Sequence, residues 1–173
     1  GSIIAVSQGI HIVLPRHFLP GEAAIMVPKT EDGRVLFAVP WHDHVFVGTT
    51  DTPVASAKPE PRALSEEREF VMTHACKYLN HNPKPEDVCS IFAGLRPLVR
   101  SDDSNGNTAA LSRDHSIIVS QSGLITLTGG KWTTYRKMAE DVIDHAETLA
   151  GLEHQTCPTV NLQIHGWTHE PIK

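Results

Sequence analysis

Alternating apolar and polar positions occupy the N-terminal part of the chain and predict β-strands. The runs are short, rich in β-branched residues and separated by turn-forming residues, with Glu31-Asp32-Gly33 as a hairpin turn. They cover residues 9–15, 23–28, 34–41 and 44–51. Connections of hairpin length join antiparallel neighbours, so this part is expected to form an antiparallel sheet.

A first amphipathic helix is predicted after the proline-rich passage from Pro53 to Pro61. Ser65 can cap its N-terminus, Glu66 and Glu67 suit its first turn, and it is expected to end near His81. Its apolar face consists of Phe70, Val71, Ala75, Tyr78 and Leu79. The spacing of this face at three and four residues distinguishes it from the strands before it.

A second helix is predicted within residues 129–151, directly after the short strand 123–128 and a Gly-Gly turn. Thr133 or Thr134 can supply the N-cap, and Gly151 suits a left-handed C-terminal position. The apolar face includes Tyr135, Met138, Val142 and Ile143. Such a corner directs backbone N–H groups and the positive end of the helix dipole toward one point, which favours an anion or a polarised carbonyl.

Between the helices, residues 88–99 read as a buried strand, followed by a polar loop and a hairpin that turns at residues 120–123. Because hairpin-length connections dominate, the fold class is α+β, with a mostly antiparallel sheet flanked by helices. A strand, Gly-Gly turn and helix form its C-terminal unit.

Composition narrows the function classes. The 173 residues carry a formal net charge of -5 and no broad excess of Lys and Arg, so nucleic-acid binding is not expected. No apolar run approaches the roughly 20 residues of a membrane span, and the expected location is cytoplasmic. His42-Asp43-His44 lacks a third ligand at a clear spacing, so no metal is expected.

Cationic residues in the second half suggest a site for an anion. Arg96 lies in an otherwise apolar strand, where a buried guanidinium needs an anionic partner, either a ligand or one of Asp102, Asp103 and Asp114. Arg113 and Lys131 could complete a phosphate pocket, since arginine forms forked contacts and lysine supplies a compact charge. A Gly-Gly turn with a solvated Lys131 is the alternative. The sequence around Gly130 lacks the spacing of a Walker loop.

Several motifs resemble the FAD-dependent glycerol-3-phosphate dehydrogenases of the D-amino-acid-oxidase-like flavoprotein group. They are "SQGIHIVLP", "VGTTDTP", "AGLRPLV", "LSRDH" and "GGKWTTYRKMAEDVID", and the similarity covers roughly residues 7 to 165. It implies oxidation of sn-glycerol 3-phosphate to dihydroxyacetone phosphate, with hydride transfer to FAD and then electron transfer to quinone or oxygen. That family's G-x-G-x-x-G motif is missing here, so the chain resembles an excised middle fragment that is inactive alone and does not retain FAD.

The resemblance also implies residue roles. His11 is the candidate catalytic base, and Arg96 lies near the reacting carbinol, in a catalytic and substrate-binding role. Arg113 and Lys131 hold the phosphate. The cofactor-binding residues are Gly129, Gly130, Lys131, Thr133 and Thr134.

The expected organisation is a substrate-binding sheet domain at 7–122, an element facing the flavin at 123–151 and a tail at 152–173. The strand-Gly-Gly-helix element is expected to belong to the FAD domain of the full-length protein. Peripheral association of that protein with the cytoplasmic membrane is left open. An isolated fragment is expected to self-associate through the exposed apolar face of its second helix. Two alternatives stay open: a stand-alone small-anion-binding or assembly module, and a related flavin oxidase acting on an amino or hydroxy acid.

Overall fold

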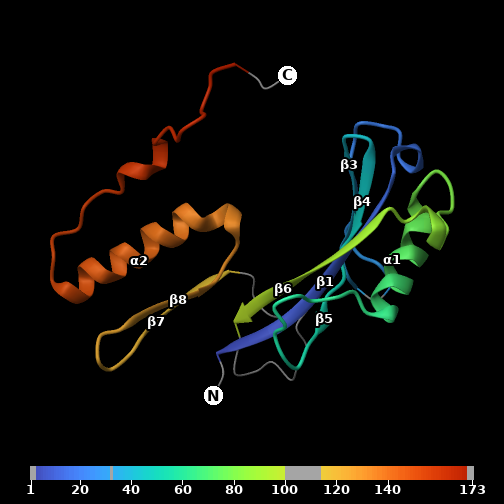
Figure 1. The fold of residues 1–173 in the computed structure, drawn as a ribbon. Helices are drawn as coiled ribbons and strands as arrows, with labels where there is room; N and C mark the ends of the chain where they lie inside the picture. The colour runs from blue at the N-terminus through green and yellow to red at the C-terminus, as the bar shows by residue number, and fades with distance from the viewer. Residues whose placement is uncertain (1–2, 32, 100–113, 171–173) are drawn as a thin grey trace. The chain divides into compact units, whose positions relative to one another are not determined.

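The structure, a computed structural model, describes residues 3–31, 33–99 and 114–170. The chain divides into two compact units, residues 1–112 and 113–173, each with its own helix and antiparallel sheet (Figure 1). The predicted α+β class with mostly antiparallel pairing is confirmed. The second unit begins earlier than the predicted element 123–151, because the strand after residue 114 pairs with the strand before the Gly-Gly turn.

A six-stranded sheet forms the first unit, with the order β2-β3-β4-β1-β5 and β6 paired to β1. The strands are β1 (Ile4–Pro15), β2 (Ile25–Val27), β3 (Leu36–Trp41), β4 (His44–Gly48), β5 (Thr52–Pro53) and β6 (Ser90–Val99). The predicted run 44–51 therefore ends at Gly48, and β1 begins earlier than predicted. The turn predicted at residues 31–33 includes Asp32, which lies outside the described residues; Gly33 has a φ of 86°.

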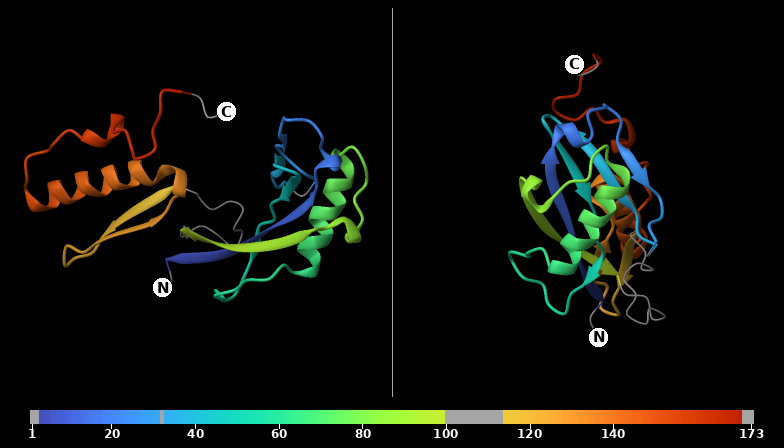
Figure 2. Two further views of the ribbon diagram at one scale, coloured as in Figure 1. Left: turned by 45° about the horizontal axis from the view of Figure 1, so that its top comes forward. Right: turned by 90° about the vertical axis from the view of Figure 1, so that its right-hand side faces the viewer.

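Helix α1 (Ser65–Tyr78) packs against one face of this sheet (Figures 1 and 2). Val71 and Ala75 of the predicted apolar face are buried against alternate residues of β1 and β4, and Leu79 is buried just after the helix. The strand residues of this core are Ile10, Ile12, Leu14, Val45 and Val47. Burial of one face of the helix and one face of the sheet supplies the main stabilisation of the unit.

Two details of the prediction for the first unit are wrong. Ser65 does not cap α1, because the helix N-cap is Leu64, whose backbone N–H donates to the Glu67 carboxylate at 2.9 Å. Residues 88–99 are not a buried strand, since in the described residues β6 pairs only with β1 and leaves Phe92 48% exposed. A strand at the edge of a sheet can be apolar in sequence and still leave part of its side chains exposed to solvent.

The second unit contains the hairpin of β7 (His115–Val119) and β8 (Ile125–Gly129), followed by helix α2 (Tyr135–Ala150). A short 3-10 turn, Trp132–Thr134, precedes α2, and another, Pro158–Asn161, lies in the tail. Gly151 ends α2 in the left-handed region, with a φ of 63°, as predicted. No residue of α2 is fully buried, and Tyr135 and Ile143 are more than half exposed.

Candidate active site

The register of β1 places His11 and Arg96 on the same face of the first sheet. In the antiparallel pair of β1 and β6, Ser7 lies opposite Arg96 and His11 lies opposite Phe92. Directly paired residues point to the same side of a sheet, and side chains alternate along a strand. Ser7, His11, Phe92 and Arg96 therefore share one face, while Ile10 and its alternate neighbours face α1.

Arg96 lies across the backbone of β1 and is anchored at the end of β4. Its Nη1 donates to the carbonyl oxygen of Thr50 at 3.0 Å, and its Nη2 donates to Thr49 Oγ1 at 2.8 Å. A Cβ at Gly9 would lie 2.2 Å from Nη2, so only glycine leaves room for this guanidinium. The predicted anionic partners Asp102 and Asp103 lie outside the described residues.

His11 is in a comparable position beside a second glycine. Its ring stacks on Phe92 with centroids 5.1 Å apart, and a Cβ at Gly48 would lie 2.5 Å from its Cδ2 atom. Burial lowers the pKa of His11, and the positive charge of Arg96 lowers it further. The imidazole is therefore held neutral near pH 7, which is the state that can accept a proton.

Aromatic side chains surround these polar groups. Phe37 and Phe46 lie on the same face as His11, because Gly48 pairs with both His11 and Phe37 while Val39 pairs with Phe46. Phe46 lies edge-to-face against Phe92, and Phe37 is 41% exposed. Among the described residues, this face therefore combines glycines and partly exposed aromatic side chains with the His11 imidazole, the Arg96 guanidinium and the Ser7 hydroxyl, which donates to the Asp51 carboxylate. It can bind a ligand that has both an apolar surface and an anionic or hydroxyl group.

The second unit contains the other predicted site residues. Gly129 and Gly130 have φ values of 77° and 78°, which explains why both are glycine. A Cβ at Gly130 would also lie 2.5 Å from Met138 Sδ, so this glycine allows α2 to pack closely. Lys131 is exposed, and its amine forms no hydrogen bond or ion pair within the described part of the chain.

Thr134, one of the two predicted residues, is the N-cap residue of α2, but the predicted capping by its hydroxyl is wrong. Neither Thr133 nor Thr134 caps α2 through its hydroxyl; instead Thr134 Oγ1 accepts the N–H of Lys131 at 3.1 Å and donates to the Lys131 carbonyl at 3.0 Å. The hydroxyl therefore closes the 3-10 turn before the helix. One of the backbone N–H groups expected to be free for a ligand is consequently occupied.

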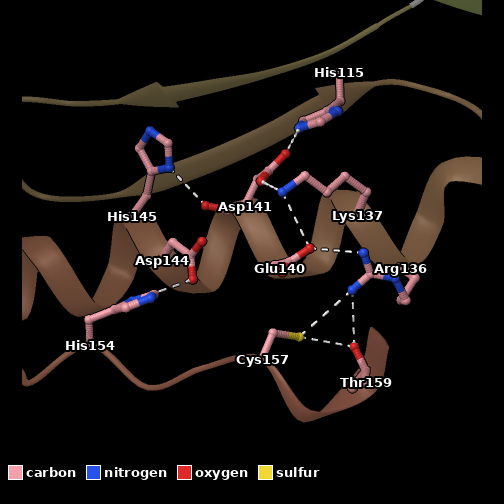
Figure 3. A network of polar contacts seen from close by, with 10 residues as sticks. All are labelled: His115, Arg136, Lys137, Glu140, Asp141, Asp144, His145, His154, Cys157 and Thr159. Carbon is pink, nitrogen blue, oxygen red and sulfur yellow. Dashed lines mark hydrogen bonds and ion pairs between the residues drawn. The ribbon is translucent and has the colours of Figure 1, made fainter. Parts of the chain in front are cut away.

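A polar network, absent from the sequence prediction, connects α2 to its hairpin (Figure 3). His115 Nε2 on β7 lies 3.0 Å from Asp141 Oδ2, and Lys137 Nζ lies 2.8 Å from the other oxygen of the same carboxylate. Arg136 and Lys137 both pair with Glu140, at 2.9 and 3.3 Å. The i,i+4 spacing of Lys137 and Asp141 was readable from the sequence, but the contact with His115 depends on the fold.

The tail contacts the same helix, and Figure 3 shows Arg136 with Thr159 and His154 with Asp144. Arg136 Nη1 donates to Thr159 Oγ1 at 3.3 Å, and His154 Nδ1 lies 3.0 Å from Glu147 Oε2. Ligand atoms of Asp144, Glu147 and His154 lie within 4.8 Å of one another. Solvent-facing acidic groups commonly gather without an ion, so the absence of a metal stays a prediction.

The predicted site residues thus fall into two groups in different units: His11 and Arg96 in the first, and residues 129–134 in the second. Arg113 lies outside the described residues. Sequence reasoning missed the residues that hold the first group, namely Thr49, Thr50 and the glycines beneath the two side chains. A strand-interior glycine is the signal that could have indicated them, because it commonly marks a close backbone approach.

An antiparallel sheet with one helix-covered face and one open face is a common arrangement that does not by itself assign a function. No family model matches the chain. A mitochondrial glycerol-3-phosphate dehydrogenase of Arabidopsis thaliana is 41% identical over 170 residues, covering 95% of this chain and 27% of that protein. The mitochondrial enzyme of Mesocricetus auratus is 40% identical over 167 residues, covering 95% of this chain and 23% of that protein.

A solved structure supports the same relationship. The glycerol-3-phosphate dehydrogenase of Bacillus halodurans, complexed with FAD, matches with a TM-score of 0.69 and 33% identity, over 90% of this chain and 29% of the other. The chain is therefore homologous to one segment of the glycerol-3-phosphate dehydrogenases, and it spans about a quarter of the relatives' length. No helix among the described residues combines the length and the apolar composition that a membrane crossing requires.

Proposed function

We propose that this chain is the substrate-binding part of a flavoenzyme that oxidises sn-glycerol 3-phosphate to dihydroxyacetone phosphate. The observation that carries the proposal is that His11, whose pKa is lowered, and Arg96, which is anchored by Thr50, lie on the same face of the sheet, opposite α1. The relatives' names supply the substrate class, and the FAD in the Bacillus halodurans enzyme supplies the cofactor. The chain alone is proposed to be inactive and not to retain FAD.

His11 is the proposed general base. Oxidation of the C2 alcohol removes a proton from oxygen and a hydride from carbon; the proton passes to His11, and bound FAD accepts the hydride. An imidazole with a lowered pKa is neutral at pH 7 and so is ready to take the proton. The nearby guanidinium of Arg96 would stabilise negative charge that develops on the C2 oxygen, because it is fixed before the reaction starts.

The phosphate and the flavin would involve the second unit. Lys131 supplies an exposed ammonium group, and Arg113 is proposed as its partner in holding the phosphate. The proposed cofactor contacts are Gly129, Gly130, Thr133 and Thr134. This corner is accessible to solvent, and the two glycines have no Cβ that would keep a ligand away from the backbone. Their backbone would face the flavin ring, with Lys131 adding positive charge near its carbonyl groups.

The remaining roles concern the full-length protein. We infer that quinone or oxygen receives the electrons and that the protein can bind peripherally at a membrane surface. The cytoplasmic location stays a prediction, and the plant and animal relatives cited above are named as mitochondrial. Self-association of the chain alone is proposed because α2 leaves Tyr135 and Ile143 exposed.

Anaerobic mixing of the full-length protein with glycerol 3-phosphate tests the proposal. Loss of the oxidised flavin's visible absorbance, with formation of dihydroxyacetone phosphate, is the expected result. Lactate and an amino acid serve as competing substrates. Flavin reduction by either of these, but not by glycerol 3-phosphate, would favour an oxidase for amino or hydroxy acids. A full-length protein that binds no flavin would favour an anion-binding module.

A further inference from the structure

Glu67 is the most deeply buried carboxylate of the described residues, at 1% exposure. Its Oε2 accepts from Gln8 Nε2 at 2.7 Å and from the Leu64 N–H at 2.9 Å, while Oε1 accepts from Thr50 Oγ1 at 2.9 Å. A buried charge is costly unless its oxygens are satisfied, and here both are. Burial alone would raise the pKa of Glu67, but the donors around it, the Leu64 N–H first among them, together lower that pKa.

Thr50 connects this carboxylate to the open face of the sheet. It is fully buried and lies just beyond the end of β4, where the ladder with β1 stops. Its hydroxyl donates to Glu67 and accepts the Ile10 N–H at 3.0 Å, which replaces the missing ladder bond. Its carbonyl oxygen accepts from Arg96 Nη1 at 3.0 Å. One residue therefore bonds to the helix, to the central strand and to the arginine.

The hydroxyl of Thr50 has a single proton, so it can donate to only one acceptor at a time, and that acceptor determines how the side chain is held. With Glu67 ionised, the proton points to the carboxylate, and an oxygen lone pair remains for Ile10. The Thr50 backbone is then held at both its side chain and its carbonyl. Without the acceptor at Glu67, the Thr50 hydroxyl keeps the bond from Ile10 but loses its bond to α1. The Thr50 backbone, whose carbonyl accepts from Arg96 Nη1 at 3.0 Å and from Thr49 Oγ1 at 3.2 Å, is then held less firmly.

We propose that Glu67 is a positioning residue for Arg96 in the oxidation described above, acting through Thr50 and never touching the substrate. The inference rests on the proposed function. The chain of bonds runs from α1, on the covered side of the sheet, to the guanidinium on the open side. Thr50 links the two ends, because its hydroxyl donates to Glu67 and its carbonyl accepts from Arg96, whose side chain is long and flexible.

The test compares Glu67→Gln with Val71→Ala, a matched control that trims a buried side chain one turn further along α1. In Glu67→Gln, the one remaining oxygen is expected to serve the two donors Gln8 and Leu64, which leaves the amide NH2 facing Thr50 Oγ1. This change should lower turnover of the full-length protein about tenfold to 100-fold, as expected for a guanidinium displaced by about 1 Å. In the 173-residue chain it should also raise the pKa of His11, measured by NMR, because the guanidinium moves away. Val71→Ala should lower stability without either effect.

A double-mutant cycle with Arg96→Met separates positioning from a purely structural role. If Glu67 acts through Arg96, Glu67→Gln should change neither turnover nor the pKa of His11 further in the Arg96→Met background. Effects that persist there in full would overturn the proposal, as would a Glu67→Gln variant that is less stable but unchanged in both readouts. Thr50→Val, which removes only the hydroxyl, should reproduce the Glu67→Gln effects if Glu67→Gln fails to fold.

The NMR readout does not depend on any activity. Failure of glycerol 3-phosphate to reduce the flavin would therefore reject the proposed function, while the response of His11 would still decide whether Glu67 positions Arg96.

Discussion

Replacing Gly9 by alanine should displace the Arg96 guanidinium while the sheet stays folded. A Cβ at Gly9 would lie 2.2 Å from Nη2 and 2.4 Å from Nη1 of Arg96, whereas ordinary contacts begin at 3.4 Å. The guanidinium must therefore retreat by about 1 Å to restore van der Waals contact. It can do so, because it is the end of a flexible side chain on an edge strand.

The energetic cost follows from the two hydrogen bonds that this retreat weakens, to Thr50 at 3.0 Å and to Thr49 at 2.8 Å. A bond from a charged donor contributes about 1.5–3 kcal/mol, and water replaces part of it at a half-exposed site. Alanine also recovers about 0.5–1 kcal/mol relative to glycine in a strand. We expect the free energy of unfolding to fall by only about 1–2 kcal/mol.

Activity should suffer far more than stability. A misplacement of about 1 Å in a catalytic group can lower the rate about 100-fold. Urea unfolding of the chain and initial rates of flavin reduction in the full-length protein measure the two effects. Gly94→Ala is the control for stability, since Gly94 pairs with Gly9 but its added Cβ would meet open space; Gly21→Ala, also in open space, is the control for activity.

An active Gly9→Ala variant would refute this reasoning. If its rate matched that of Gly21→Ala while Arg96→Met was inactive, the guanidinium would function from a different position. If Gly94→Ala destabilised the chain as much as Gly9→Ala, the effect would belong to the strand backbone and not to the contact with Arg96.

Three further predictions follow from the glycines and from His11. Gly48→Ala should lower the free energy of unfolding in urea by about 1–3 kcal/mol, a larger loss than that of Gly9→Ala. The added Cβ would lie 2.6 Å from the Ile10 carbonyl oxygen, which cannot move without disturbing β1. Gly151→Ala should cost about 1–2 kcal/mol in thermal unfolding, since alanine is strained at a φ of 63°, and Gly151→Asn should cost less. The NMR titration midpoint of His11 should lie below 6.5, the ordinary pKa value for histidine, so kcat/KM should fall as the pH drops through that lowered pKa and level off at higher pH. Arg96→Met should raise the midpoint only in part, because burial is the larger cause.

Much of the fold could be predicted because periodicity reports on local structure. Helix α2 has regular apolar spacing, and glycine at 151 marks its end, so both were predicted close to their observed positions. The end of β4 at Gly48 was not predicted, since residues 49–51 continue the same strand-like pattern. What ends the strand there is the pairing of β1 with β5 at Ser7 and Gln8, a contact with no local sequence signal.

The chemically distinctive residues of the candidate site could be named from the sequence, but their supports could not. Arg96 was conspicuous as a guanidinium in an apolar strand, and the expected partner was an anion. Its acceptors among the described residues include the carbonyl of Thr50 and the hydroxyl of Thr49, two groups that occur throughout proteins and so carry no sequence signal. The sequence predicts Glu67 as a favourable charge in the first turn of α1, whereas its burial depends on the side chains of Gln8 and Thr50, which only folding brings to it.

Glycine offers the best route from sequence to such a site. The left-handed glycines at positions 129, 130 and 151 were recognised because they stand at a turn or a helix end. Gly9 and Gly48 have no such conformational need, and glycine within a strand weakens it. They are explained by the neighbouring strand, where the missing Cβ leaves space for a side chain that crosses over. Glycine in a strand is therefore a signal that needs the fold to interpret it: in this chain Arg96 crosses Gly9 and His11 crosses Gly48, whereas a Cβ at Gly94 would meet open space.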